Sequence, residues 1–242
     1  MIIPPNWTLP EAIKNRLGQN TYGRQRVIAE DGHVLLVLHQ PPGADDSKRE
    51  GVLFWRNPAG EWQASRGGSG PGALKRHIQS FAEMETKLAA EFENAGDIKV
   101  IFDLVEALTP LARSARNMQI AVQDAREAIK GDPFIIEMRD LAYDAERNID
   151  LLLEDVRLGI QYRTAREEEK QAKAGQDALR ASHRLNVLAA LFLPVTALAS
   201  IFGMNFVHPL DDKNGMHWWL VLAAGVVLGF GVKSWVTAKG RE

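Results

Sequence analysis

The sequence contains no cysteine among its 242 residues, so disulfides and thiolate metal sites are excluded. The chain has little net charge, because 29 basic and 31 acidic residues leave a formal net charge of -2. No basic tract stands out, so nucleic acid is not an expected partner. The chain also has no recognisable nucleophile and base pair, phosphate loop or paired catalytic carboxylates. We therefore expect no enzyme and no cofactor.

The N-terminus has neither a basic start nor an apolar core between Met1 and Glu11, so no secretory signal is expected. The mean hydropathy of -0.20 is that of a soluble protein, and any membrane part must be a minority of the chain. Membrane insertion would then be directed by segments near the C-terminus.

Charged residues are missing from one long stretch, Leu185–Asn205. A helix of about 20 residues can cross a bilayer core of ~30 Å. A plain anchor does not need the polar residues that this stretch contains, which are Asn186, Thr196, Ser200 and Asn205. Polar groups in a membrane helix usually face a partner helix or water. The stretch therefore predicts a membrane helix with a path for a solute beside it.

A second apolar span covers residues 218–238, with tryptophans at both ends and three glycines that favour close helix packing. Arginine and lysine are abundant before the first span, and Lys239 and Arg241 follow the second. The connecting loop, residues 206–217, has Lys213 against Asp211 and Asp212. By the positive-inside rule, we expect a multi-pass protein of the cell inner (plasma) membrane with both termini cytoplasmic.

Residues 1–96 are predicted to form a small cytoplasmic α+β domain. The apolar run 34–38 is typical of a strand, and residues 52–62 indicate a β-hairpin around a turn at 57–60. Trp55 and Trp62 are expected to pack across this hairpin in the core, with a ligand-stacking role as the alternative. Residues 66–72 indicate a flexible linker or loop, and residues 73–94 an amphipathic helix.

Residues 97–184 are predicted to form a cytoplasmic helical hairpin and stalk. Its first helix ends near Lys130, with a kink expected at Pro110. Gly131-Asp132-Pro133 is a helix stop followed by an N-cap and a first-turn proline. No signal interrupts the helix that begins at Pro133, so we expect it to continue through the first span, over about 110 Å at 1.5 Å per residue. Such a helix needs neighbours along its apolar stripe, which indicates an oligomer.

The first span has Pro194-x-Thr196 at its middle and Gly203-Met204-Asn205 followed by phenylalanine at its outer end. Together with the long helix before it and the second span after it, this arrangement resembles the CorA-type magnesium transporter family. The resemblance covers the chain from Asp97 onwards. It implies an α+β membrane protein that assembles as a homopentameric funnel, with the span at 185–205 lining a pore, the loop at 206–217 outside, and a short cytoplasmic tail at 239–242.

In this family the Gly-Met-Asn turn forms the external mouth, which here implies Gly203, Met204 and Asn205. Mg²⁺ holds its water shell tightly, and a ring of Asn205 amides can accept hydrogen bonds from that shell. Neutral oxygens attract a cation without trapping it. By helical spacing, Thr196 and Ser200 are candidates for further polar positions, and Leu193 and Leu185 for apolar gates. Hydrogen bonding to a neighbouring backbone is the alternative for Thr196, Ser200 and Asn186.

The family responds to cytoplasmic magnesium through acidic residues between subunits, and Asp144 is our first candidate for that role. The usual acidic loop motif is not recognisable here, although Asp211 and Asp212 are candidates for a cation-attracting external rim. The expected partners are thus a divalent cation, most readily Mg²⁺, the lipid membrane and further copies of the chain.

Two alternative functions stay open. One is a transporter of Zn²⁺, Co²⁺ or Ni²⁺, since His208 and His217 flank the loop. The other is a membrane scaffold or sensor with a vestigial pore.

Overall fold

A computed structural model describes residues 2–18, 20–43, 49–203 and 216–238. The described chain divides into two compact units, Met1–Thr164 and Ala165–Glu242. In chain order the elements are α1 (Glu11–Lys14), β1 (Arg26–Glu30), β2 (His33–His39), β3 (Gly51–Arg56), β4 (Trp62–Ala64), α2 (Gly70–Glu93), α3 (Ile98–Ala128), α4 (Pro133–Gly203) and α5 (Met216–Ala238). This mixture of helix and strand confirms the α+β prediction, and the boundary expected at residue 96 falls inside the first unit.

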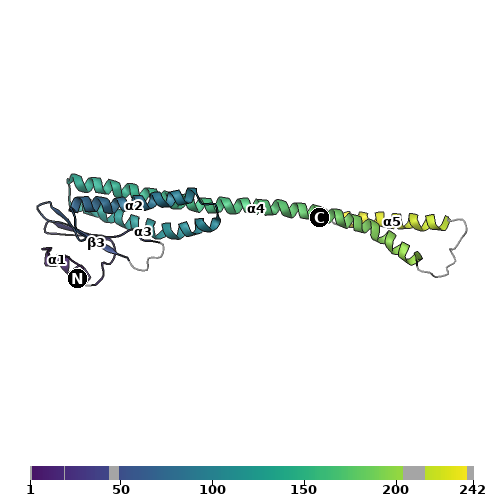
Figure 1. The fold of residues 1–242 in the computed structure, drawn as a ribbon, viewed down its shortest axis with the longest axis horizontal. Coiled ribbons are helices and arrows are strands. Elements are labelled where there is room, and N and C mark those ends of the chain that lie inside the picture. The colour runs from purple at the N-terminus through teal and green to yellow at the C-terminus, as the bar shows by residue number, and fades with distance from the viewer. Residues whose placement is uncertain (1, 19, 44–48, 204–215, 239–242) are drawn as a thin grey trace. The chain divides into compact units, whose positions relative to one another are not determined.

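The sheet of the first unit is an antiparallel meander in the order β1-β2-β3-β4. Strand β2 is buried on both faces, which explains why its sequence is a continuous apolar run. Val34, Leu36 and Leu38 belong to the core shared with the helices, whereas Leu35 and Val37 pack with the N-terminal segment. In Figure 1 the sheet and α1 lie at one end of the bundle formed by α2, α3 and the first part of α4.

The predicted hairpin at residues 52–62 is confirmed, but the two tryptophans do not pack on each other. Arg56 pairs with Trp62 and Trp55 pairs with Gln63, so the indoles point to opposite faces of the sheet. Trp55 contacts Trp7, with ring centroids 5.5 Å apart, and its Nε1 donates to His33 Nδ1 at 3.1 Å. Both indoles are buried, in the two separate cores, so neither offers an open stacking surface.

The linker predicted at residues 66–72 is shorter than expected, because α2 already begins at Gly70. Gly70 is buried against β4, where a Cβ would lie 2.1 Å from the carbonyl oxygen of Trp62. No other residue type fits this approach without moving the strand or the helix. The glycine that resembled a flexible linker is therefore a packing position.

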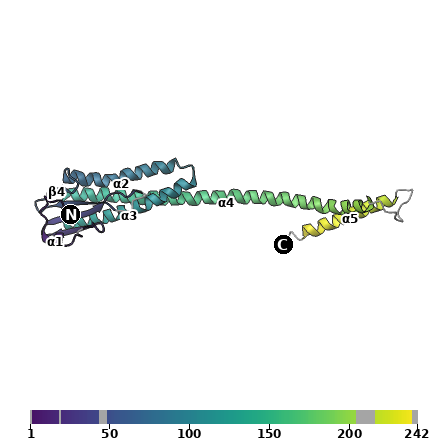
Figure 2. The ribbon, with the colours of Figure 1, turned by 60° about the horizontal axis from the view of Figure 1, so that its bottom comes forward.

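Helices α2, α3 and α4 share one apolar core in the first unit, in which Phe81, Leu108 and Ile149 are fully enclosed. Pro110 lies inside α3. Figure 2 shows the three helices from a second direction, running side by side. The chain reverses between α3 and α4 at Gly131, whose φ is 85°. This confirms the predicted helical hairpin.

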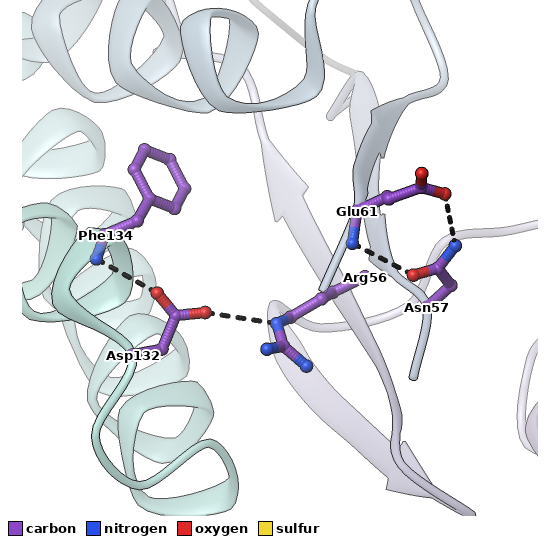
Figure 3. Close-up of polar contacts among 5 residues, drawn as sticks. All are labelled: Arg56, Asn57, Glu61, Asp132 and Phe134. Carbon is purple, nitrogen blue, oxygen red and sulfur yellow. Dashed lines mark hydrogen bonds and ion pairs between the residues drawn. The ribbon is translucent and has the colours of Figure 1, made fainter. Parts of the chain in front are cut away.

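Asp132 caps α4 and joins it to the sheet. One carboxylate oxygen accepts a hydrogen bond from the backbone N–H of Phe134 at 3.0 Å, and the other lies 3.1 Å from Arg56 Nε. Both charged side chains are mostly buried, at 16% and 18% exposure. Figure 3 shows this chain of contacts beside Asn57 and Glu61, which close the β3–β4 turn. One side chain thus fixes the start of the longest helix against the end of β3.

The helix predicted to start at Pro133 and run on without a break is confirmed as far as Gly203, over 71 residues. Among the described residues, α4 is the helix that is long and apolar enough to cross a membrane, and only 6% of its apolar window is buried in the single chain. Helix α5 contributes a shorter apolar stretch, Leu222–Ser234. The second span and the placement of the termini stay predictions.

Candidate functional site

Two glycines bring α5 against the apolar part of α4 in the second unit. A Cβ on Gly229 would lie 2.9 Å from the carbonyl oxygen of Leu191, and one on Gly225 would lie 3.2 Å from Leu198 Cδ1. The higher-numbered glycine meets the lower-numbered leucine, so the two helices are antiparallel here. Small residues four apart allow this close approach. Leu191, Val195 and Leu198 therefore define the face of α4 that α5 covers.

The four candidate pore residues on the described part of α4 lie on its other side. At about 100° per residue, Leu185, Leu193, Thr196 and Ser200 fall within about 80° of arc, roughly opposite the face covered by α5. All four side chains are exposed in the single chain, and the two leucines are each 66% exposed. The sequence-predicted residues are thus brought together on one uncovered stripe.

The hydroxyl of Thr196 forms a hydrogen bond to a backbone carbonyl, which the sequence analysis gave as the alternative to a pore role. Its Oγ1 donates to the carbonyl oxygen of Phe192 at 2.8 Å, four residues earlier. The bond uses the hydroxyl proton and leaves the oxygen lone pairs exposed on the uncovered stripe. Thr196 can therefore accept a hydrogen bond from a water molecule while its orientation is held by its own helix.

The external mouth lies mostly outside the described residues. Gly203 ends α4, whereas Met204, Asn205, Asp211 and Asp212 are not described. The role predicted for this turn and for the acidic rim stays a prediction. Ser200, one turn before Gly203, is the last polar residue of the stripe.

Asp144 lies on the solvent-exposed side of α4 in the first unit, beside the buried Ala145. It makes no hydrogen bond or ion pair with the rest of the described chain. Within the same residues, no group of three or more His, Asp or Glu side chains is arranged to hold a metal ion. The regulatory role of Asp144 stays a prediction.

Sequence reasoning missed two buried histidines at the boundary between sheet and helices. Burial lowers the pKa of His77 to about 4, and it also lowers the pKa of His39. His77 contacts the rings of Phe54 and Phe81, at 5.5 Å and 5.8 Å between centroids. The available signal was the position of His39 directly after the apolar run 34–38, because a strand buried on both faces can also bury its last side chain.

A search of the curated proteins found no match. Among solved structures, the chain is similar to the CorA magnesium transporter from Methanocaldococcus jannaschii, with 16% identity and a TM-score of 0.51 over 93% of this chain and 81% of that one. It is also similar to full-length CmaX, with 13% identity and a TM-score of 0.52 over 90% of this chain and 78% of that one.

A third solved structure covers less of the chain. The cytoplasmic domain of ZntB from Vibrio parahaemolyticus matches at 14% identity and a TM-score of 0.50, over 67% of this chain and 80% of that one. At these identities the structures show a shared fold. The model of the family described as CorA-like Mg²⁺ transporter protein matches residues 73–238, which is more than half of the 242 residues. The chain therefore belongs to the CorA-like Mg²⁺ transporter family.

Proposed function

We propose that the protein is a homopentameric channel-type transporter that conducts divalent cations, with Mg²⁺ as its principal ion, through a pore lined by the uncovered stripe of α4. The observation that carries this proposal is the division of α4 into two faces. Helix α5 packs on Leu191 and Leu198, while Leu185, Leu193, Thr196 and Ser200 face away from it. An apolar helix with an exposed polar stripe is stabilised in a membrane when that stripe faces water.

The chemistry of the stripe suits a hydrated ion better than a dehydrated one. Mg²⁺ gives up its first-shell water reluctantly and needs octahedral oxygen ligands when it does. The stripe offers neutral hydroxyls and no carboxylate, so it can accept hydrogen bonds from the water shell without binding the metal directly. Asn205, beyond the described end of α4, would form the outer ring by the same chemistry.

Leu193 and Leu185 would close the pore as a hydrophobic gate. Five copies of one leucine form a ring that narrows the pore and expels its water, which stops conduction. The rings lie eight residues apart, a separation of about 12 Å along the helix. We assign the hydrophobic gate to these two positions.

Asp144 would contribute to control of this gate from the cytoplasmic part. Its carboxylate is exposed and unpaired within the described chain, and it would gain ligands only from a neighbouring copy. Mg²⁺ bound between copies would link the cytoplasmic concentration of the ion to the arrangement of the subunits.

The test is uptake of Mg²⁺ into proteoliposomes by purified protein with Asn205→Leu. The matched control is Asn214→Leu, in the loop that follows the first span. The proposal expects Asn205→Leu to abolish uptake and Asn214→Leu to preserve it. Equal uptake by wild type and Asn205→Leu would contradict the assigned mouth. Competition by Zn²⁺, Co²⁺ and Ni²⁺ in the same vesicles separates the principal ion from the alternatives. Absence of flux for every ion from well-folded pentamers would favour a scaffold or sensor.

A further inference from the structure

A cavity of about 440 Å³ lies in the first unit, and all of its lining residues belong to that unit. It is bounded by the end of β2 and the residues after it, by the residues that lead into β3, and by one side of α3. Its size is within the range of pockets for small organic molecules. Nothing in the transport proposal uses it.

Two arginines from different parts of the chain line the cavity. Arg49 precedes β3 and Arg113 lies on α3. Both side chains are exposed, and neither has an ion-pair partner among the described residues. The one carboxylate of the lining, Glu50, is already engaged with Arg66 at 2.7 Å. The lining therefore presents two guanidinium groups whose charge is not matched within the described chain.

The floor of the cavity is a fixed polar network. The side chain of Gln25 donates to the carbonyl oxygen of Ser114 at 2.8 Å and to its hydroxyl oxygen at 3.2 Å. Its amide oxygen accepts from the backbone N–H of His39 at 3.2 Å. Since the Ser114 oxygen accepts from Gln25, its own proton remains available to a ligand. Asn117, one turn further along α3, adds a second neutral donor to the lining.

We propose that this cavity binds a small organic phosphate, with the phosphate held by Arg49 and Arg113. Two guanidinium groups match the charge of about −1.5 to −2 that a phosphate monoester carries at neutral pH, and they bind its oxygens in a fork geometry. Ser114 and Asn117 donate to the remaining oxygens. The organic part packs against the apolar rings of Pro41, Pro42 and Pro110, which line the same cavity.

Binding of adenosine monophosphate to the purified full-length protein in detergent, measured by calorimetry without Mg²⁺, tests the proposal. We expect saturable binding, with adenosine and citrate at least tenfold weaker. Arg49→Gln and Arg113→Gln should each weaken the affinity about tenfold, which is typical of a lost charge-assisted hydrogen-bonded pair. Arg126→Gln is the matched control, because Arg126 is also exposed on α3 but does not line the cavity.

Several outcomes would overturn the assignment. These are no saturable binding of adenosine monophosphate at millimolar concentration, equal binding of adenosine, tighter binding of citrate, or equal losses in Arg126→Gln and the two cavity variants. Thermal unfolding of each variant checks that it is folded. Because the two arginines lie on different parts of the fold, one variant suffices for the test if the other does not fold. The assay requires no ion flux, so its failure leaves the proposed transport function standing.

Discussion

Replacement of Asp132 should separate two contributions that one carboxylate makes to the first unit. Asp132→Asn keeps an oxygen that can accept from the N–H of Phe134, but it removes the charge that faces Arg56. Asp132→Ala removes both. The carboxylate bonds are 3.0 Å to the N–H and 3.1 Å to Arg56 Nε, so both contacts are fully formed in the wild type.

The magnitudes follow from the burial of the pair. A hydrogen bond to a charged group contributes about 1.5–3 kcal/mol, and loss of an N-cap costs about 1 kcal/mol. With side chains 16% and 18% exposed, some solvent screening remains, and the lower half of the first range applies. We expect Asp132→Asn to lower the free energy of unfolding by about 2 kcal/mol and Asp132→Ala by about 3 kcal/mol.

Tryptophan fluorescence during thermal unfolding of the detergent-solubilised protein is a suitable assay. Trp62 contacts the ring of Phe134, with centroids 5.8 Å apart, so it reports on the region that Asp132 holds together. A loss of 2 kcal/mol corresponds to roughly 4–8 °C in a unit of this size. Arg56→Gln should lower the free energy of unfolding by about as much as Asp132→Asn. The double variant should be less stable than either single variant by no more than a few tenths of a kcal/mol. Additive losses in the double variant, or unchanged stability in Asp132→Asn, would refute the pairing.

The remaining predictions concern the buried histidine and the helix contact of the second unit. Because burial lowers the pKa of His77 from 6.5 to about 4, the unfolded chain takes up a proton that the folded chain does not. Stability should therefore fall by up to about 3 kcal/mol as the pH drops from 6.5 to 4. His77→Phe should remove most of this slope in denaturant unfolding at several pH values, and an unchanged slope would contradict the assignment. Gly229→Leu should push α5 from the backbone of Leu191 and lower the yield of the proposed pentamer in gel filtration. Gly231→Leu should not, because a Cβ there would have nothing within 4 Å.

Most of the fold was predictable from local patterns. The continuous helix from Pro133 followed from the absence of any stop signal, and the turn before it followed from a glycine, a capping aspartate and a proline in the required order. Strand β2 was recognisable because burial on both faces favours a continuous apolar run, here residues 34–38. These signals are local, so a single sequence contains them.

The predictions were wrong at positions whose conformation or packing depends on residues distant in the sequence. The sequence around Gly70 indicates a linker, because the strand carbonyl that excludes a Cβ is not visible in the sequence. The sequence predicts that Trp55 and Trp62 pack across the hairpin, but the register, which depends on the turn, offsets them by one residue. The cavity was missed for the same reason, since Arg49 and Arg113 are 64 positions apart along the chain. The stripe on α4 was predictable because helical spacing alone places Thr196 and Ser200 together.

The absence of cysteine from the chain allows a direct test of which face of α4 lines the pore. Thr196→Cys places a thiol on the uncovered stripe, whereas Leu198→Cys places one on the face packed against α5. A positively charged thiol reagent is added to each variant during Mg²⁺ uptake into proteoliposomes. We predict that the reagent blocks uptake through Thr196→Cys and leaves uptake through Leu198→Cys unaffected. Block at Leu198→Cys with no effect at Thr196→Cys would contradict the claim that the uncovered stripe of α4 lines the pore.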